Sequence, residues 1–528
     1  MIRNYLLIVL CFLSLFRTQA QDVNWAEDVA CLIYTHCSPC HNSYNNPEIQ
    51  FMNFQDVYDQ RLTVEIYVNT GKMPPGLTNS HYNKFAGDKG LTEQEINIIK
   101  VWARDLALRG DTTKEPVAPI YAKPVSTLIN PEVSFKSGYV LPDTIEGHLR
   151  RCFILPNPGI KMKTIKSIEV VPADPYIVHS VFIYTDTSSI PLALDLSDSG
   201  EGYVNFFGTG STSSKPLYGW TLGSGPFHMP PNTGLELDSS AYFIIQIQYA
   251  EEGANQTDST IVNIKLDTST NTRKAITSDL LNHEDNLING PFELEVDSSK
   301  IFHEIYTVVN DLSLLSIAPH AHYYCDNMLV YAVLPNTDTV PLLKIDNWDA
   351  GWSEGSYFYQ KPVHLPQGSA IHAFSLYSNT NSNLHDLNDS LEPLDGGVDE
   401  HHEEMVFNFT YLNYSTGDEH MVFDTLKHRL HYQACKPVHN VSSINSVIAD
   451  QFDLFPNPAT GTVTILSKKI YDSYSVVLYD IMGQEYLKKT FWDEKEAILD
   501  VSELITGIYF VQIVYGNNYE IRRIIVTD

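Results

Sequence analysis

The spacing of apolar positions changes along this chain, from helical near the N-terminus to alternating further on. Residues 25–36 carry an amphipathic helical pattern, and a second helix is predicted after Thr92. Thr92 and Glu95 form a capping box at its start, and Gly110 ends it. The apolar face of this helix comprises Ile99, Trp102, Ala103 and Leu106. The pattern predicts a small all-α domain over residues 21–112.

Between residues 131 and 440 the pattern is that of a β protein. Short apolar runs such as 176–184 and 242–249 are separated by clusters of Gly, Asn, Asp and Ser, which favour turns. The span is long enough for two β-sandwiches of about 150 residues each. A polar stretch at 282–286 is a reasonable boundary between them. The predicted domains are 131–285 and 286–440, preceded by a proline-rich linker at 113–130.

The two ends of the chain have different compositions. Arg3 precedes an apolar run from Tyr5 to Phe16, and Thr18-Gln19-Ala20 provides small residues for cleavage. Residues 1–20 are therefore predicted to be a signal peptide, and no other apolar stretch is long enough to span a membrane. After a linker at 441–451, residues 452–528 are predicted to form a small all-β sandwich. The fold class is thus multidomain: one all-α domain and three all-β sandwiches.

Length and charge limit the function classes. A chain of 528 residues has room for three or four domains at roughly 150 residues each. The formal net charge is −30, from 34 basic and 64 acidic residues. A surface this acidic repels a polyanion, which argues against nucleic acid as a partner.

The run Cys37-Ser38-Pro39-Cys40-His41 has the spacing of a c-type haem attachment site. Two thiols attach the haem covalently and the histidine binds its iron. A zinc or thiol-redox site is the alternative, although no second cysteine or histidine pair lies close by. Met73, 32 residues after His41, is the expected second axial ligand, with an ordinary core or surface methionine as its alternative. Residues 21–112 resemble a small cytochrome c domain.

The remaining cysteines are expected outside the cytoplasm. Cys11 falls inside the predicted signal peptide, which leaves Cys31, Cys152, Cys325 and Cys435. Four thiols in an oxidising compartment can pair in three ways. Cys152 with Cys435 is the first hypothesis, because these residues lie near the two ends of the middle region.

The C-terminal segment carries Phe455-Pro456-Asn457-Pro458, Asp480-Ile481-Met482-Gly483 and Gly507-Ile508-Tyr509-Phe510. In these motifs it resembles the sorting domain read by the type IX secretion system of Bacteroidetes; a small β-sandwich binding module is the alternative. The resemblance implies export through the periplasm to the outer-membrane surface or the medium. The secretion machinery would then be a partner of the chain.

A second metal centre is predicted at Ala318-Pro319-His320-Ala321-His322. In a strand, residues i and i+2 face the same side, so both imidazoles can meet one ion. Met405, just before the alternating strand 406–414, offers a thioether. Two imidazoles and a thioether favour copper, especially Cu(I). The neighbouring pair His401-His402 is interpreted as a solvated loop.

With these residues, the middle region resembles the copper type II, ascorbate-dependent monooxygenases, the family of dopamine β-monooxygenase and peptidylglycine α-hydroxylating monooxygenase. The motifs that carry the resemblance are Arg151-Cys152-Phe153, Ile177-Val178-His179, Trp220, Ile247-Gln248-Tyr249, the His-x-His run, Lys361 to Gly368, and Glu404-Met405. It implies two β-sandwiches with one copper each. The oxygen-activating copper would be held by the catalytic residues His320, His322 and Met405.

The first sandwich departs from that family's pattern. Where the family has adjacent histidines, this chain has His179-Ser180, and Gln248 replaces a third histidine before Tyr249. His179 alone is a doubtful metal ligand, and a structural histidine is its alternative. The electron-supplying copper is therefore expected to be absent or weakened. His228 is a spare candidate, with no spacing that puts it beside His179.

Two functions follow. The first is a secreted copper monooxygenase that uses molecular oxygen to hydroxylate a C–H bond of a small organic substrate. Haem c, reduced by an external electron donor, would then supply electrons in place of the missing copper. The second is a non-enzymatic surface electron-transfer or copper-binding protein on a degenerate scaffold. Nothing in the sequence identifies the substrate.

Overall fold

The computed structural model describes residues 23–526 with interruptions, and the chain forms two compact units, Met1–Val438 and His439–Asp528. The residues outside the description are 1–22, 47, 75–77, 80–81, 89, 146–148, 157–163, 206–207, 268, 270, 381–392, 398–401, 424–450, 458, 472, 481–484, 503, 505–506, 516–517 and 527–528. The predicted signal peptide and the predicted linker at 441–451 lie almost wholly outside it. Among the described residues, no helix is long and apolar enough to cross a membrane.

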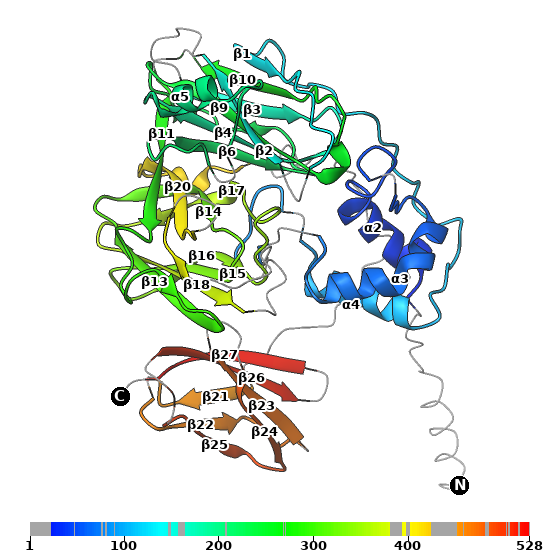
Figure 1. Cartoon of the computed structure of the whole chain (residues 1–528). Helices are drawn as coiled ribbons and strands as arrows, with labels where there is room; N and C mark the ends of the chain where they lie inside the picture. Colours follow the sequence, from blue (N-terminus) through cyan, green and yellow to red (C-terminus); the bar gives the residue numbers. More distant parts are fainter. Residues whose placement is uncertain are drawn as a thin grey trace, which may run out of the picture. The chain divides into compact units, whose positions relative to one another are not determined.

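The first unit begins with a helical region, drawn in blue in Figure 1. Its helices are η1 (Trp25–Val29), α2 (Ala30–His36), α3 (Phe54–Asn69) and α4 (Glu93–Arg104). Trp25 and Trp102 lie at the centre of its core, with ring centroids 5.8 Å apart. The capping box predicted at α4 is present: Glu95 N donates to Thr92 Oγ1, and Thr92 N donates to Glu95 Oε2.

Two details of this region differ from the prediction. Helix α4 ends at Arg104, so Leu106 leaves the helical face and is 78% exposed. The Trp102 indole N–H donates to Leu108 O, which fixes the chain after the helix. Helix α3 was not predicted, because its apolar residues are spread around the helix rather than gathered on one side. Its N-cap is nevertheless regular: Asn53 Oδ1 accepts from the backbone of the first turn.

The first β-sandwich follows. One sheet has the order β5-β2-β9-β4-β6, built from β2 (Leu149–Leu155), β4 (Val178–Asp186), β5 (Tyr203–Val204), β6 (Lys215–Thr221) and β9 (Tyr242–Tyr249). The strands that face it are β1 (Val133–Lys136), β3 (Thr164–Val171), β7 (Phe227–His228), β8 (Thr233–Glu236) and β10 (Ile261–Asp267). Short helices α5 (Ile190–Ser197) and η2 (Glu251–Gly253) lie in its connections. The strand predicted at 242–249 is confirmed as β9, and 176–184 overlaps β4.

The second β-sandwich has two four-stranded layers. One contains β11 (Arg273–Asn282), β20 (Val406–Asn413), β14 (Leu312–His320) and β17 (Tyr357–Leu365). The other has β13 (Ser298–Thr307), β18 (Ala370–Asn379), β15 (Cys325–Val333) and β16 (Thr339–Ile345). A two-stranded sheet pairs β12 (Glu293–Leu294) with β19 (Leu394–Asp395), and η3 (Asp418–His420) follows β20.

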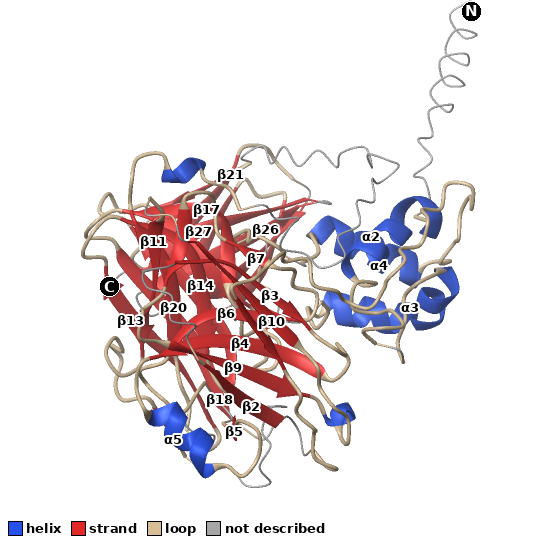
Figure 2. Cartoon of the chain, turned by 90° about the horizontal axis from the view of Figure 1, so that it is seen from above, coloured by secondary structure: helices blue, strands red, loops and turns tan. Residues whose placement is uncertain are grey.

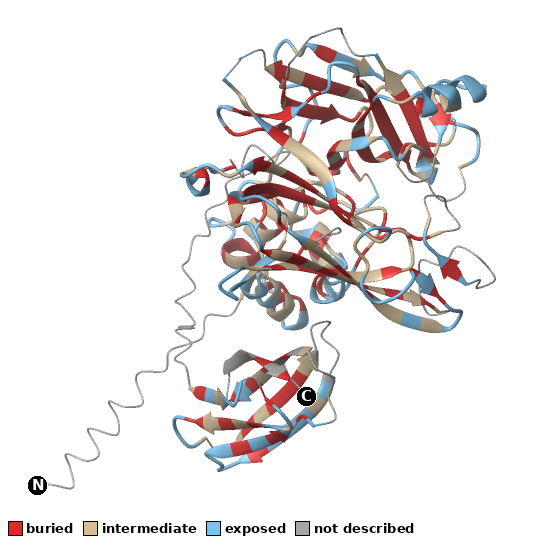
Figure 3. Cartoon of the chain, turned by 90° about the vertical axis from the view of Figure 1, so that its left-hand side faces the viewer, coloured by how far each residue is buried: buried red, intermediate tan, exposed pale blue. Residues whose placement is uncertain are grey.

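Strand β11 joins the two sandwiches. It pairs in parallel with β8 of the first sandwich and antiparallel with β20 of the second. One layer of the first sandwich and one layer of the second therefore form a single nine-stranded sheet. Figure 2 draws the strands of the chain in red. Within this sheet, β3 and β14 are buried at most positions, whereas β18 of the facing sheet alternates buried with partly buried positions; Figure 3 colours the residues by burial. Backbone hydrogen bonds through β11 therefore connect the first sandwich directly to the second.

The described residues of the second unit form strands and no helix. Its sheets are β21 (Phe452–Phe455), β22 (Thr462–Ser467) and β25 (Glu496–Asp500), and β24 (Glu485–Trp492), β23 (Ser473–Asp480), β26 (Gly507–Tyr515) and β27 (Asn518–Val526). Residues from both sheets share one apolar core, which includes Phe452, Val476 and Val511. This agrees with the small sandwich predicted for residues 452–528.

Candidate metal centre

The two predicted histidine ligands lie side by side in the second sandwich. Strand β14 ends at His320, and His322 follows two residues later, with the ring centroids 5.4 Å apart. The side chain of His320 is 20% exposed and that of His322 only 2%. Two imidazoles are therefore held together at the end of a strand, close to the surface of a cavity.

The Nδ1 atom of each ring has a partner that orients it. His320 Nδ1 pairs with the carboxylate of Glu354, and His322 Nδ1 lies 2.7 Å from His402 O. Hydrogen bonds of this kind fix the ring orientation and leave Nε2 as the nitrogen available to a metal. The Trp348 indole N–H also donates to His322 O, which holds the backbone at this point.

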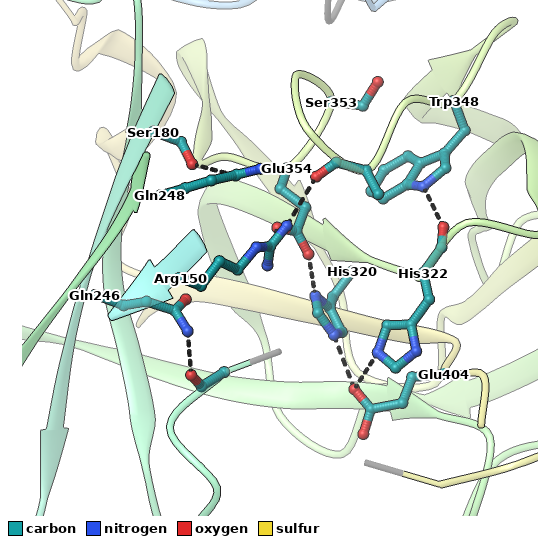
Figure 4. A network of polar contacts seen from close by, with 12 residues as sticks. Arg150, Ser180, Gln246, Gln248, His320, His322, Trp348, Ser353, Glu354 and Glu404 are labelled. Carbon is teal, nitrogen blue, oxygen red and sulfur yellow. Dashed lines mark hydrogen bonds and ion pairs between the residues drawn. The ribbon is translucent and has the colours of Figure 1, made fainter. Parts of the chain in front are cut away.

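A carboxylate, Glu404, completes the group. Its Oε2 atom is 2.8 Å from His320 Nε2 and 3.9 Å from His322 Nε2. The ligand atoms of these three residues all lie within 4.8 Å of one another. Figure 4 shows His320 between Glu354 and Glu404, with His322 beside them. This cluster has the donor types and the spacing of a metal site.

Met405, the predicted third ligand, belongs to the apolar core of the second sandwich. It is 0% exposed and lies in the same cluster as Phe407 and Phe409. Glu404, Val406 and Asn408 line the cavity instead. The structure thus places Glu404 beside the imidazoles, while ligation by Met405 stays a prediction.

The pKa values of the two imidazoles move in opposite directions. Burial disfavours the charged form of His320, but the carboxylates of Glu354 and Glu404 outweigh it and raise its pKa to about 10. For His322, burial and the neighbouring charge on His320 lower the pKa to about 3. The pKa of Glu404 is lowered, because hydrogen bonding to His320 and its charge exceed the cost of burial.

The group is tied to the first sandwich by an ion pair. Arg150 of β2 places Nη1 3.3 Å from Glu354 Oε2 and donates from Nη2 to Ala350 O. The two side chains are only 3% and 5% exposed. Burial would raise the pKa of Glu354, but the charges of Arg150 and His320 keep it below its usual range. The ion pair therefore links the sandwiches directly behind His320.

A cavity of about 670 Å³ opens beside this group, between the two sandwiches. His320, Glu354 and Glu404 lie on its wall. Aromatic side chains from the first sandwich and hydroxyl-bearing residues from both supply much of the remainder, among them Phe182, Tyr184, Tyr218, Ser211, Ser213, Thr277 and Ser278. The volume suits a small organic molecule.

The corresponding position in the first sandwich has a different chemistry. Ser180 Oγ donates to Gln248 Oε1 at 2.8 Å, and both side chains are buried. His179 faces elsewhere, with its ring centroid 3.9 Å from that of Trp352 in the second sandwich. His228 lies 2.8 Å from Ser167 Oγ. Ser180 and Gln248 thus form a hydrogen bond with each other. His179 packs on Trp352, between the two sandwiches.

The haem motif lies after α2, in the helical region. His41 Nδ1 is 3.1 Å from Ile49 O, so its N–H can donate there and leave Nε2 for an iron. Among the described residues, Cys37 and Cys40 form no disulfide, and burial raises the pKa of the Cys37 thiol to about 12. Met73 is described, but residues 75–77 that follow it are not. The axial role of Met73 stays a prediction.

The other predicted features have separate outcomes. Cys31, Cys152 and Cys325 are free thiols, and Cys435 lies outside the described residues, as does His401. Three further histidines of the second sandwich have local partners: His303 Nε2 lies 3.0 Å from His372 Nδ1, and His364 stacks on Tyr414 with centroids 3.8 Å apart. None of these joins the His320 cluster.

Sequence reasoning missed Glu404, Glu354 and Arg150. Glu404 could have been found from the strand that follows, because alternate positions Met405, Phe407 and Phe409 are apolar and place Glu404 on the other face. Arg150 and Glu354 are 204 positions apart, and no local pattern connects them.

Comparison with known proteins identifies the last part of the chain. The secretion system C-terminal sorting domain family matches residues 453–527. The tail is a type IX secretion sorting domain. It directs the protein to the cell surface or the medium through that secretion system, so the secretion machinery is a partner.

Other similarities are short or distant. An endo-acting ulvan lyase of Formosa agariphila is 29% identical over 79 residues, which is 15% of each chain. The similarity to a solved structure of PNGF-II extends over 54% of this chain and 66% of the PNGF-II chain, at 10% identity and a TM-score of 0.26. The similarity to dimeric latent PorU from Porphyromonas gingivalis extends over 72% of this chain and 34% of the PorU chain, at 13% identity and a TM-score of 0.13. The chain thus spans a small part of the curated relative and less than two thirds of either structure.

Proposed function

We propose that this chain is a secreted, haem-bearing and metal-dependent oxidoreductase that uses molecular oxygen to hydroxylate a C–H bond of a small organic substrate. The observation that carries the proposal is the group formed by His320, His322 and Glu404, of which His320 and Glu404 line a cavity of about 670 Å³. The same chain carries a haem attachment sequence at Cys37, Cys40 and His41. A redox metal beside a substrate-sized cavity and a haem as electron source are the parts that such a reaction needs.

The residues around the two imidazoles fit a bound metal. His320 and His322 would hold the ion through Nε2, since their Nδ1 atoms contact Glu354 and His402 O. When bound, the metal would supply oxygen activation. The protein's part is to fix the imidazoles, to keep the reacting region away from bulk water and to hold the substrate against the cavity wall.

The residues of the haem motif fit a covalent haem c. Cys37 and Cys40 form no disulfide among the described residues and are three positions apart, as attachment to one haem requires. The contact between His41 Nδ1 and Ile49 O orients the ring and would leave Nε2 for an iron. When bound, the haem would supply one-electron transfer from an external donor.

The helical region is anchored on the two sandwiches, which supports an electron-supplying role. Asn79 N donates to Lys344 O at 2.7 Å, and Ala86 N donates to Phe358 O at 2.6 Å. Cys40 packs against the apolar core of the first sandwich, as does Trp352, whose loop continues to Glu354. The haem motif thus belongs to the same compact unit as the metal group.

Product-coupled oxygen uptake tests the proposal. The wild-type chain, supplied with a reductant and screened against small organic molecules, should consume oxygen in proportion to hydroxylated product. His320→Ala should abolish the coupled uptake, while His303→Ala, outside the site, should retain it. Product formation by His320→Ala at the wild-type rate would contradict the proposal.

A non-enzymatic electron-transfer or copper-binding role is the second candidate. The buried Ser180–Gln248 pair favours it, because this position in the first sandwich has no imidazole. That function predicts one bound metal and a reducible haem, with no substrate oxidised in any screen. Metal binding alone fits both functions, so the coupled product is the discriminating observation.

A further inference from the structure

We propose that Glu404, rather than Met405, completes the metal site, so that His320, His322 and Glu404 form a two-histidine, one-carboxylate site for a divalent metal ion. The inference rests on the proposed function for the place of the metal and adds the third ligand and the class of ion. It predicts a first-row divalent metal where the sequence predicted Cu(I).

The convergence of the donor atoms is the first argument. The Nε2 atoms of His320 and His322 approach the same carboxylate oxygen, Glu404 Oε2, at 2.8 and 3.9 Å. An ion placed among these three atoms would replace the direct contacts with coordination bonds of about 2.0–2.2 Å. Small side-chain adjustments suffice, because the donor atoms already lie within 4.8 Å of one another.

The outer contacts are the second argument. Metal-binding histidines usually donate their other ring N–H to a carboxylate or a backbone carbonyl. Both forms are present: Glu354 pairs with His320 Nδ1, and His402 O lies 2.7 Å from His322 Nδ1. Arg150 holds Glu354 in turn. The cluster therefore has an outer layer as well as three donors.

The alternation of β20 is the third argument. The chain entering this strand directs Glu404, Val406 and Asn408 to the cavity, while Met405 and Phe407 are buried in the core. Adjacent positions of an extended segment point to opposite sides. The carboxylate therefore shares the cavity wall with His320, and the thioether belongs to the apolar side.

The donor set decides the class of ion. A thioether selects soft Cu(I), whereas two imidazoles and a carboxylate suit divalent metals of intermediate hardness, among them Fe(II) and Zn(II). Of these, Fe(II) is the ion that also supports oxygen chemistry. Zinc, which is redox-inert, is the convenient probe of the same donors.

Metal titration of the full-length, haem-loaded and metal-stripped chain tests the inference. Zn²⁺ and Cu(I) are titrated by calorimetry into wild type, Glu404→Gln, Met405→Leu and His320→Ala. Wild type should bind one Zn²⁺ that His320→Ala lacks. Glu404→Gln should weaken this site by at least about tenfold, and Met405→Leu should change it by less than about threefold.

The opposite pattern would overturn the inference: unchanged Zn²⁺ binding in Glu404→Gln with loss of Cu(I) binding in Met405→Leu. The haem absorption spectrum and the melting temperature of each variant show that it is folded. No turnover enters the measurement, so this result is independent of the proposed function. If zinc binds through Glu404 but no hydroxylated product is found in the oxygen-uptake screen, the metal site stands and the proposed oxygenase function fails.

Discussion

At the scale of single residues, Glu304 of β13 is the least expected feature of the second sandwich. Its side chain is 0% exposed, and neither carboxylate oxygen has a hydrogen-bond partner among the described residues. Burial alone raises its pKa to about 9. The carboxyl group is therefore protonated at neutral pH, because ionising it inside the apolar core would cost more than holding the proton.

Glu304→Gln should remove a pH-dependent loss of stability. A carboxyl group whose pKa is raised on folding binds its proton more tightly in the folded state. Stability therefore falls as pH rises from the unfolded pKa of about 4.3 to the folded value. The slope approaches about 1.4 kcal/mol per pH unit in this window.

Unfolding free energies of wild type and Glu304→Gln at pH 5, 6, 7 and 8 measure this effect. The difference between the two proteins should shift steadily in favour of the variant as pH rises. Glu293→Gln, on the exposed side of β12, is a matched control and should show no such trend. Parallel pH profiles for wild type and Glu304→Gln would contradict the assignment.

At the scale of elements, local patterns in the sequence predict the positions of helices and strands well, whereas they leave the third metal ligand a prediction. Strand β9 and the capping box of α4 follow directly from alternation and from Thr92 with Glu95. Met405 was chosen for the softness of its sulphur, although its alternation with Phe407 places it on the core face. Helix α3 was missed, because its only clear local signal is the N-cap Asn53.

The cap of α4 gives a prediction at this scale. Thr92→Ala removes the Oγ1 acceptor of the Glu95 backbone N–H and leaves a helix-terminal donor to water. It should lower the stability of the helical region by about 1 kcal/mol.

Thermal unfolding followed by the helical signal in far-ultraviolet circular dichroism measures that loss. Thr63→Ala, at an exposed position inside α3, is the matched control and should be neutral or slightly stabilising, because alanine favours helix interiors. Equal melting temperatures for wild type and Thr92→Ala would show that the capping box contributes nothing.

At the scale of the whole first unit, the contact between the two sandwiches holds the candidate site together. The Arg150–Glu354 pair joins β2 to the second sandwich, and Gly219 of β6 lies so close to Gly355 that an added Cβ would be 3.0 Å from its Cα. These contacts connect residues remote in sequence, so no local pattern could have predicted them. The contact also affects the candidate site, because Arg150 of the first sandwich holds Glu354, and Glu354 in turn positions His320.

Arg150→Met should leave Glu354 buried without its main cation. Breaking a buried pair from one side costs about 3–5 kcal/mol, and the low end applies here because His320 still contacts Glu354. Denaturant unfolding of the metal-stripped protein measures the loss. The double variant Arg150→Met with Glu354→Gln should recover part of it; a double variant no more stable than Arg150→Met would argue against coupling between the two residues.

The central claim is that haem and metal act together in one chain, and rapid mixing of the reduced protein with oxygen tests it most directly. With metal bound at His320 and His322, the ferrous haem should reoxidise on mixing with oxygen and substrate. In His320→Ala, which keeps the haem motif at Cys37 to His41, the haem should stay reduced for much longer. Identical haem reoxidation in wild type and His320→Ala would contradict the account.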